Sequence, residues 1–568
     1  MAIYVHDRIL ELFEAEGIKT LLGIPDPSFV AMFIAAEARG WRVIAPHHEE
    51  AGAFMADGMW RMTGRPGVIV GNQGPGVANL APAAICAAKE NVPTIFLAGQ
   101  RQRIYEERVR RGRFQYTRQP RYFEEAMKYV GTIEYPEQTD EIVHEAFRRA
   151  LSGTPGPVYI EYPMNMIPAQ LDLPPAPPPA AYRLVQQQAS GSAIAEALAL
   201  IKAAKLPILL VGQGVFVSRA HDAVAALARA LNCPVIQTPG GAAFLEGLED
   251  RSFAYASPAG IEAVANSDLV IAVGTEIGEP LHYGSGRHWA KGNTDRKWIY
   301  IERDPTAIGV NRRIDAPLVG DLREVVPQLT AAVAPLGLKA PAQLEAWSKA
   351  QGELAAMMLA SVPARSTPIH PARLVVEATR VLPKDAVMVR DGGSMNIFTW
   401  AYSQLQPRDA MWCQNFGHLG TGLPHALGAQ LAVGDSRRVV LMTGDSSFLF
   451  HISELETAVR KKLPVVCIVG CDYSWGLEAA VYKMNFGPQS PETEAHWGTQ
   501  LRLDKIAEGF GAYGEYVERA EDIGPAVARA LAAGKPAVVQ VAIDPLANAT
   551  EVPGVEEFMT WYGEEGYK

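Results

Sequence analysis

RRVVLMTGDSSFLFHISELETAVRKKLPVVCIVGCDYSWG, residues 437–476, contains two short apolar runs, and an aspartate follows each of them. Asp445 comes after the run Val439–Met442, and Asp472 comes after Val465–Val469. A helical stretch separates the two, so the segment predicts a strand–helix–strand unit with an acidic side chain at the carboxyl end of each strand. Ligands bind at that edge of an open parallel sheet. Two carboxylates there suit a small divalent cation that also holds a phosphate, so we expect a metal–diphosphate site.

The rest of the chain repeats this alternation of short apolar runs with helical patterns, which is typical of parallel α/β sheets. The segment LDLPPAPPPAAYRL, residues 171–184, is unsuited to a regular helix because proline lacks an amide hydrogen and restricts φ. We therefore predict an α/β protein of three doubly wound parallel-sheet domains. The expected boundaries are 1–170, 190–340 and 368–550 for the domains, 171–189 and 341–367 for linkers, and 551–568 for a C-terminal tail.

Composition narrows the classes of function. The 568 residues carry a formal net charge of −10, so we expect no nucleic-acid partner. The five cysteines are scattered singly without a CxxC pair, which argues against a zinc knuckle or a disulfide framework. The first residues resemble an amphipathic helix rather than a signal peptide, and no apolar stretch reaches the roughly 18 residues of a membrane span. We expect a cytoplasmic protein with no membrane partner.

Four further segments combine glycine with acidic or polar side chains near the ends of expected strands. They are PHHEEAGAFMADG (46–58), GNQGPGVAN (71–79), DGGSM (391–395) and NFGHLGTGLP (415–424). Taken alone, each has a structural explanation, because acids stabilise a helix start through its dipole and glycines permit tight turns. Their joint occurrence with the two aspartates favours a shared function.

In this order the segments resemble thiamine-diphosphate (ThDP) enzymes of the acetolactate synthase, pyruvate decarboxylase and benzaldehyde lyase superfamily. The resemblance implies a pyrimidine-binding domain, a central domain and a diphosphate-binding domain, with ThDP and Mg²⁺ as cofactors. It implies that Asp445, Asp472 and the backbone carbonyl of Ser474 hold the metal. Asparagine is usual in the family where this chain has Asp472, so we expect metal binding at a more negative site.

The resemblance also assigns residues to cofactor and substrate. Glu49 takes the place of the glutamate that hydrogen-bonds the pyrimidine ring and activates the cofactor, and Leu419 takes the place of the residue that supports its bent shape. The other expected cofactor contacts are Gly74, Asn79, Gly392, Gly393, Ser394, Met395, Gly417, Gly444, Ser446, Ser447 and Gly476. Further catalytic candidates are His48 and Gln115, and the expected substrate pocket contains Asn72, Gln73, Leu477 and Tyr482.

Two acidic residues bear on the reaction. Asp26 and Glu478 lie where pyruvate decarboxylase has active-site acids, and two carboxylates near a carbanion could protonate it and release an aldehyde. A turn aspartate and a helix-start glutamate are the alternative interpretations. We expect non-oxidative decarboxylation of a 2-oxo acid with carboligase activity. The alternatives are a 2-hydroxyacyl-CoA lyase, benzaldehyde-lyase-like acyloin chemistry, an acetolactate synthase and an inactive scaffold.

The sequence also suggests an anionic substrate, a nucleotide ligand of the central domain and an oligomeric state. The arginine-rich stretch 99–121 is either a solvated loop or a site for an anionic substrate such as a coenzyme A thioester. Relatives bind flavin or an adenine nucleotide in the central domain, where Asp304 either meets a ribose or caps a turn. In the family, active sites lie between subunits, so we expect a homodimer or a dimer of dimers in which Glu49 and Asp445 of different chains serve one site.

Overall fold

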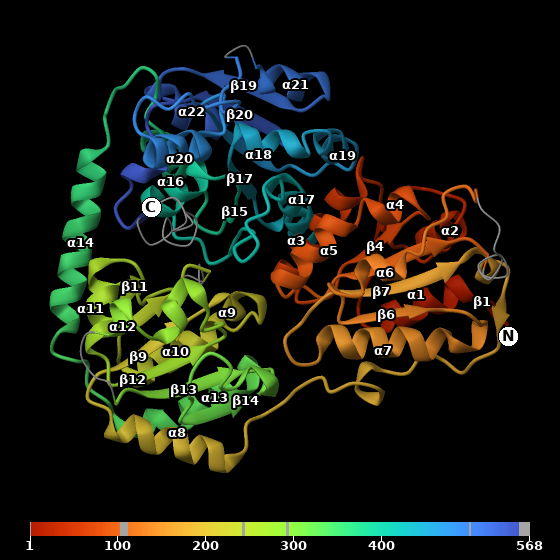
Figure 1. Cartoon of the computed structure of the whole chain (residues 1–568), viewed down its shortest axis with the longest axis horizontal. Helices are drawn as coiled ribbons and strands as arrows, with labels where there is room; N and C mark the ends of the chain where they lie inside the picture. The colour runs from red at the N-terminus through yellow and green to blue at the C-terminus, as the bar shows by residue number, and fades with distance from the viewer. Residues whose placement is uncertain (1, 103–111, 241–244, 291–294, 499–500, 556–568) are drawn as a thin grey trace. The chain divides into compact units, whose positions relative to one another are not determined.

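Three six-stranded sheets follow one another along the chain, and every strand pairing within them is parallel (Figure 1). The computed structural model describes residues 2–102, 112–240, 245–290, 295–498 and 501–555. Helices connect successive strands, which confirms the predicted α/β class with three parallel-sheet domains. Part of the arginine-rich stretch, 103–111, and the end of the expected tail, 556–568, lie outside the described residues.

The N-terminal sheet has the strand order β3-β2-β4-β5-β7-β6. Its strands are β2 (Thr20–Gly23), β3 (Arg42–Ile44), β4 (Val68–Gly71), β5 (Ile95–Gln100), β6 (Tyr129–Thr132) and β7 (Val158–Pro163). Its helices are α1 (Val5–Ala15), α2 (Val30–Ala38), α3 (Glu49–Thr63), α4 (Pro75–Ala78), α5 (Ala81–Lys89), α6 (Pro120–Phe123) and α7 (Thr139–Leu151). A separate antiparallel pair joins β1 (Ile3–Tyr4) to β8 (Gln170–Leu171). Strands β2, β4, β5 and β7 are buried along their whole length, as apolar runs in a covered parallel sheet should be.

The central sheet has the order β11-β10-β9-β12-β13-β14. Its strands are β9 (Pro207–Val211), β10 (Val235–Gln237), β11 (Ser252–Ala254), β12 (Leu269–Val273), β13 (Lys297–Glu302) and β14 (Ala316–Val319). Its helices are α8 (Gly191–Ala203), α9 (Gln213–Val217), α10 (His221–Leu231), α11 (Pro258–Asn266), α12 (Arg287–Ala290) and α13 (Leu322–Val333). Most of the expected linker 341–367 is a helix, α14 (Leu344–Ser361), of which only Leu344 and Trp347 are buried. Because so few residues of α14 are buried, its sequence lacks the apolar periodicity that would have predicted a helix.

The C-terminal sheet has the order β16-β15-β17-β18-β20-β19. Its strands are β15 (Val387–Arg390), β16 (Ala410–Met411), β17 (Val439–Gly444), β18 (Val466–Cys471), β19 (Tyr513–Val517) and β20 (Ala537–Ala542). The helices in this part are α15 (Pro371–Arg380), α16 (Ser394–Tyr402), α17 (Gly422–Val433), α18 (Asp445–Phe450), α19 (Glu454–Arg460), α20 (Gly476–Phe486), α21 (Leu503–Gly509) and α22 (Ala520–Ala532). Residues 437–476 therefore form β17, α18, α19 and β18, which is the predicted strand–helix–strand unit.

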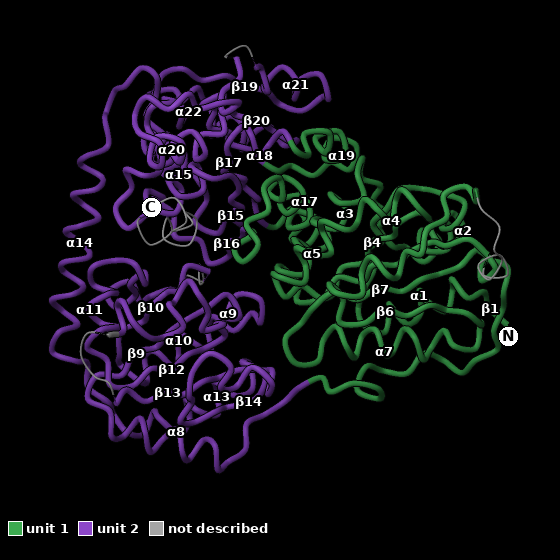
Figure 2. Tube along the Cα trace, in the orientation of Figure 1, with its two compact units in different colours: residues 1–185, 413–436, 450–465 green, residues 186–412, 437–449, 466–568 purple. Residues whose placement is uncertain are grey.

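The chain forms two compact units (Figure 2). Unit 1 consists of 1–185, 413–436 and 450–465, and unit 2 of 186–412, 437–449 and 466–568. Helices α17 and α19 thus belong with the N-terminal sheet, although they lie in the sequence between strands of the C-terminal sheet. The expected site residues are divided between the units in the same way.

Helices α3 and α17 pack closely within unit 1 because each carries a glycine at the contact. A Cβ on Gly428 would lie 2.0 Å from the carbonyl oxygen of Met55, and one on Gly58 would lie 2.4 Å from that of His425. A buried polar group completes the contact, since His425 Nε2 is 2.9 Å from Asp57 Oδ2. Glu49 is the first residue of α3, so the packing of this helix against α17 fixes its position.

Candidate active site

The two aspartates lie at one edge of the C-terminal sheet, in unit 2. Strands β17 and β18 pair in register as far as Gly444 and Gly470, so both strands end at the same level. Asp445 follows β17 at once and is 1% exposed, and the half-buried Asp472 follows β18. Burial and the charge of Asp472 raise the pKa of Asp445 well above its usual value, and burial raises the pKa of Asp472. A divalent cation between two such carboxylates would relieve both effects.

Backbone amides hold these carboxylates in place. The amides of Ser446 and Tyr473 donate to opposite oxygens of Asp445, each at 2.9 Å, and the amide of Ser474 donates to Asp472 Oδ1 at 3.1 Å. Tyr473 has φ = 57°, a left-handed conformation that is uncommon for a residue other than glycine. Strain of this kind is often found at functional sites, and here it turns the chain between Asp472 and Ser474, two of the expected metal ligands.

A cradle of glycines and hydroxyls borders the aspartates. Gly392 has φ = 93°, and a Cβ on it would lie 3.2 Å from Gly444 N and 3.4 Å from Ser447 Oγ. The hydroxyls of Ser394 and Ser447 are buried and have no hydrogen-bond partner among the described residues. Buried polar atoms without a partner are rare and point to a ligand or ordered water. The set of polar groups fits a diphosphate with its cation, because the carboxylate oxygens suit the metal and the two hydroxyls suit phosphate oxygens.

Two apolar side chains complete the border of this cradle. Met395 Sδ packs over the end of β18, 2.7 Å from the position of a Cβ on Gly470. Leu477 is buried, and its Cβ lies 3.0 Å from the position of a Cβ on Gly393. Both glycines are therefore required for the close approach of these side chains. The expected residues Met395, Gly393 and Leu477 thus share one small region of unit 2.

Helix α20 begins directly beside the metal motif. A Cβ on Gly476 would lie 2.3 Å from Asp472 Oδ2, so any larger first helical residue would displace that carboxylate. Glu478 is half-buried in the first turn of α20, and the half-buried Tyr482 follows it one turn later. A carboxylate in the first helical turn is also stabilised by the helix dipole. Glu478 therefore lies in the helical turn that directly follows the segment of Asp472.

Arg390, which the sequence analysis missed, ends β15 immediately before the glycine cradle. Its side chain is 4% exposed, and within the described residues its Nε has no hydrogen-bond partner. The guanidinium lies 5.7 Å from the ring centre of Trp412, and burial lowers the pKa of Arg390 to about 10. A buried cation without a carboxylate is unusual and makes an anionic ligand an attractive interpretation. No motif pointed to it, because its strand reads simply as an apolar run.

Glu49 lies in unit 1 and is held by a hydrogen bond from one side chain. It is 6% exposed, and its Oε2 accepts a hydrogen bond from Asn79 Nδ2 at 2.9 Å. Its other oxygen faces glycine backbone, since a Cβ on Gly76 would lie 2.9 Å from Oε1. The sequence placed Glu49 and Asn79 in separate motifs, and the structure joins them. One carboxylate oxygen is thus oriented by Asn79, and the other lies beside Gly76, where the absence of a side chain leaves room for a flat heteroaromatic ring.

The glycine-rich loop after β4 adds polar atoms to this region. Gly74 has φ = 71°, and its amide donates to Gln119 Oε1 at 2.6 Å. A Cβ on Gly74 would lie 2.5 Å from the carbonyl oxygen of Gln115, so the expected catalytic glutamine lies against the loop through its backbone. Asn72 Oδ1 and Gln73 Oε1 are buried without a hydrogen-bond partner among the described residues. Sequence analysis missed Gln119, whose only signal is a polar residue before a proline.

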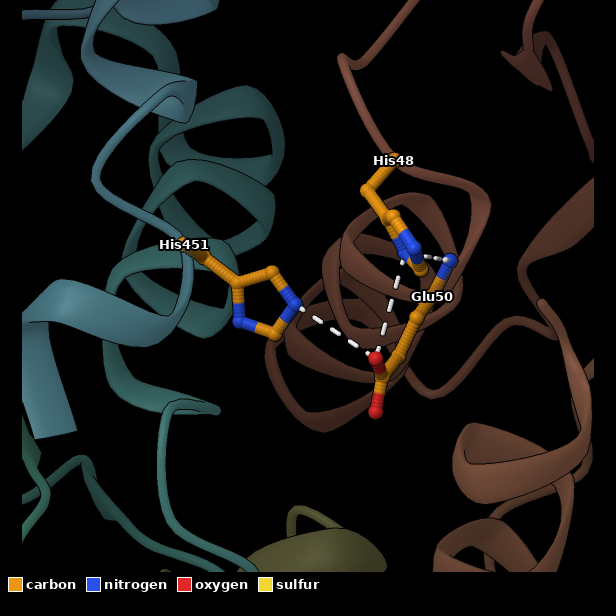
Figure 3. Close-up of side chains that lie close together, drawn as sticks. All are labelled: His48, Glu50 and His451. Atoms are coloured by element: carbon orange, nitrogen blue, oxygen red, sulfur yellow. Dashed lines mark hydrogen bonds and ion pairs between the residues drawn. The ribbon is translucent and has the colours of Figure 1, made fainter.

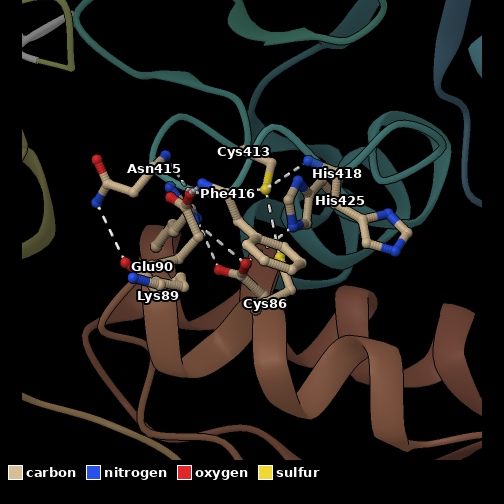
Figure 4. Close-up of polar contacts among 10 residues, drawn as sticks. Cys86, Lys89, Glu90, Cys413, Asn415, Phe416, His418 and His425 are labelled. Carbon is tan, nitrogen blue, oxygen red and sulfur yellow. Dashed lines mark hydrogen bonds and ion pairs between the residues drawn. The ribbon is translucent and has the colours of Figure 1, made fainter. Parts of the chain in front are cut away.

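The segment that carries Gly417 and Leu419 is anchored to the end of α5 (Figure 4). Glu90 Oε1 accepts a hydrogen bond from the amide of Phe416 at 3.1 Å and lies 3.6 Å from Cys413 Sγ. Gly417 has φ = 65°, which makes the turn into Leu419 possible. Leu419 is half-buried in unit 1. Its place relative to the chain's cradle in unit 2 stays a prediction.

Two expected catalytic residues also have local structural tasks. His48 is the N-cap of α3, and its Nδ1 accepts a hydrogen bond from the amide of Glu50 at 3.3 Å. Asp26 Oδ1 accepts from the amide of Ser28 at 2.9 Å, the hydrogen bond of an Asx turn. The turn interpretation of Asp26 is thereby supported. The catalytic roles of both residues stay predictions.

Glu454 is a further residue that the sequence did not reveal. It is fully buried, and its Oε1 accepts hydrogen bonds from the amides of His47 and His48 at 2.9 and 3.2 Å. Burial raises its pKa. In the sequence it resembles any acid near a helix start. The structure makes it a support for the residues that precede Glu49.

The structure provides little support for a ligand site in the central domain or in the arginine-rich stretch. Asp304 Oδ1 accepts from Thr306 N at 2.8 Å and so caps a short helix, which leaves the nucleotide interpretation a prediction. The guanidinium of Arg101 donates to the carbonyl of Phe114, while Arg103, Arg108, Arg110 and Arg111 lie outside the described residues. Among the described helices, none has the length and apolar character needed to cross a membrane.

Comparison with known proteins agrees with this geometry. Three family models match in order: the N-terminal thiamine pyrophosphate (TPP) binding domain of TPP enzymes at 3–122, their central domain at 194–329 and their C-terminal TPP binding domain at 391–541. An acetolactate synthase large subunit of Parasynechococcus marenigrum is 30% identical over 81% of this chain and 75% of its own. A probable acetolactate synthase large subunit of Methanocaldococcus jannaschii is 28% identical over 96% and 93%. A sulfoacetaldehyde acetyltransferase of Alcaligenes xylosoxydans is 27% identical over 94% and 92%.

The three family models define the class of this three-domain α/β chain as ThDP-dependent enzymes, and the polar cradle beside Asp445 and Asp472 fits the diphosphate of that cofactor. The chain belongs to the thiamine pyrophosphate enzyme family, within the superfamily that includes the acetolactate synthases.

Proposed function

We propose that this enzyme decarboxylates a small 2-oxo acid and joins the remaining acyl unit to a second carbonyl compound. The observation that carries the proposal is the pair of buried Asp445 and half-buried Asp472 with its glycine and hydroxyl cradle. The chain is related over nearly its whole length to acetolactate synthases and a sulfoacetaldehyde acetyltransferase. When bound, ThDP supplies the carbon nucleophile and electron sink for such a reaction. The protein supplies binding, orientation and proton transfer.

The proposed roles follow from the contacts of each residue. Asp445, Asp472 and the carbonyl of Ser474 hold Mg²⁺, and the hydroxyls of Ser394 and Ser447 bind the diphosphate. Glu49, oriented by Asn79, shares a proton with a nitrogen of the pyrimidine ring. The buried guanidinium of Arg390 attracts the negative charge of the substrate, consistent with a 2-oxo acid.

We further propose that the working enzyme is a homodimer or a dimer of dimers. Glu49 lies in unit 1 and Asp445 in unit 2, and both are needed for one cofactor. In this proposal, Glu49 of one chain and Asp445 of its partner serve the same cofactor molecule.

A second candidate is the release of a free aldehyde. Glu478 favours it, because a half-buried carboxylate in the first turn of α20 follows the metal motif directly and could supply a proton. Asp26 supports it less, since its carboxylate is used in an Asx turn.

Product analysis distinguishes the candidates. Purified enzyme with ThDP and Mg²⁺ is incubated with pyruvate or benzoylformate, alone and with an acceptor aldehyde, and the products are identified by chromatography and mass spectrometry. Acyloin or acetolactate in excess of free aldehyde supports carboligation, and free aldehyde alone would refute it. Failure to bind ThDP and Mg²⁺ would instead favour an inactive scaffold.

A further inference from the structure

His48 and His451 lie beside the carboxylate of Glu50 in unit 1 (Figure 3), and His418 contacts the same carboxylate. His451 Nε2 lies 3.7 Å and His48 Nδ1 3.9 Å from Glu50 Oε2, while His418 Nε2 lies 3.4 Å from Oε1. The ligand atoms of His48, Glu50 and His451 all lie within 4.8 Å of one another. The expected functions of Glu49 and Leu419 use none of these side chains.

The spacing of these atoms is too long for good direct hydrogen bonds. Charge-assisted N–H···O bonds are about 2.7–2.9 Å long, so direct pairing leaves these contacts loose. Two ligands of one tetrahedral zinc ion are separated by about 3.3 Å, because each lies about 2.0–2.1 Å from the metal. The contacts of His451 and His48 with Glu50 Oε2, at 3.7 and 3.9 Å, are closer to the second pattern.

Backbone carbonyls orient two of the imidazoles. His451 Nδ1 lies 2.8 Å from the carbonyl oxygen of Gly420, and His418 Nδ1 lies 2.8 Å from that of Leu419. A carbonyl oxygen only accepts, so Nδ1 carries the hydrogen in both rings, and Nε2 is directed at Glu50. Metal-binding histidines typically donate their second ring N–H to a carbonyl or carboxylate in this way.

We infer that His48, Glu50 and His451 form a binding site for a transition-metal dication such as Zn²⁺, whose remaining position is open to water. Imidazole and carboxylate ligands suit Zn²⁺, whereas Mg²⁺ prefers oxygen ligands alone. The site is thus chemically distinct from the pair Asp445–Asp472. The side chains of Glu50 and His451 are 15% and 6% exposed and that of His48 is 43% exposed, so the site is shielded but has an entry path.

The position of the site indicates that a bound ion would stabilise the arrangement of neighbouring segments in unit 1. Glu50 follows Glu49 on α3, and His418 precedes Leu419 in the segment after β16. His451 lies between α18 and α19. An ion held by His48, Glu50 and His451 would therefore connect the start of α3 with the segment between α18 and α19, next to Glu49. Its binding would replace the long hydrogen bond from the amide of Glu50 to His48 Nδ1.

Cobalt spectroscopy tests the site independently of the reaction. Chelator-treated enzyme is saturated with Mg²⁺ and ThDP and titrated with Co²⁺, because tetrahedral Co²⁺ has strong visible absorption and octahedral Co²⁺ has weak absorption. We expect one Co²⁺ per chain with strong bands, and Zn²⁺ should abolish them by competition. A parallel titration in Asp445→Asn removes the competing oxygen site. Weak bands alone, or no uptake, would overturn the inference.

Variants assign the ligands. His451→Asn and His48→Asn should each lose the strong bands and the rise in melting temperature that Zn²⁺ gives the wild type. His47→Asn is the matched control, since His47 is adjacent in sequence but its Nε2 lies 2.6 Å from Glu456. It should retain both signals. If buried His451 proves necessary for folding, the partly exposed His48 decides, and unchanged bands in folded His48→Asn would overturn the inference.

Discussion

Two buried carboxylates, Glu49 and Asp445, have different neighbours and therefore different expected tasks. Glu49 accepts a hydrogen bond from the side chain of Asn79 and forms no ion pair among the described residues, which suits a proton partner. Asp445 has two backbone donors and a second carboxylate nearby, so its ionised form needs a cation. The same residue class thus does different chemistry because of its surroundings.

Replacing Glu49 with Gln should leave folding and cofactor binding intact but lower kcat at least about a hundredfold, because an amide does not exchange the proton. Turnover and calorimetric ThDP binding are measured together. The exposed Glu37→Gln serves as a control with normal turnover. Normal activity in the Glu49 variant would show that another group activates the cofactor.

Replacing Asp445 with Asn should abolish Mg²⁺-dependent ThDP binding and stabilise the apoenzyme at neutral pH. The folded-state pKa of Asp445 is raised, so its contribution to stability is present below about pH 4 and is lost as pH rises through the raised value. Each unit of upward shift corresponds to about 1.4 kcal/mol. Denaturant titrations between pH 4 and 8 should therefore show a smaller loss of stability with rising pH in the variant. An equal slope in both proteins would contradict this account.

The packing of α3 against α17 depends on glycine. The Gly428→Ala methyl group would lie 2.0 Å from the carbonyl oxygen of Met55, so the helices would have to separate. We expect a loss of about 1–3 kcal/mol in the free energy of unfolding and a lower kcat, because Glu49 begins α3.

Gly352→Ala in α14 is the matched control. Its Cβ would meet no atom within 4 Å, and the residue is exposed. Alanine there should be neutral or stabilise the protein by up to about 1 kcal/mol. Chemical denaturation of both variants measures the difference, and similar effects at the two positions would argue against the close helix contact.

For the whole molecule, the division of site residues between two units makes assembly part of the proposed function. Glu49→Gln and Asp445→Asn each remove one half of the site. If the halves come from different chains, a mixed dimer contains one intact site and one doubly altered site.

Refolding the two inactive variants together should therefore restore activity. Random pairing predicts about a quarter of wild-type activity, since about half of the dimers are mixed and each has one of two sites intact. Mixtures that stay as inactive as the separate variants would show that each chain builds its own site. A covalently linked wild-type pair provides the activity standard.

The site could be predicted only in part from the sequence. Asp445, Asp472 and Glu49 were visible because they follow apolar strands or begin a helix within recognisable motifs. Arg390 and Glu454 were not visible. Their significance depends on burial and on which groups lie nearby, and neither property is encoded by local pattern.

By itself the sequence determined the α/β class, the order of three parallel-sheet domains, and the residues at the strand ends, because strand and helix periodicities are local. Only the tertiary structure decided that Asn79 orients Glu49, that glycines let α3 and α17 meet, and that His48, Glu50 and His451 gather around one point. The physical reason is that these arrangements join positions far apart in the chain, and the close packing of the folded protein brings them together.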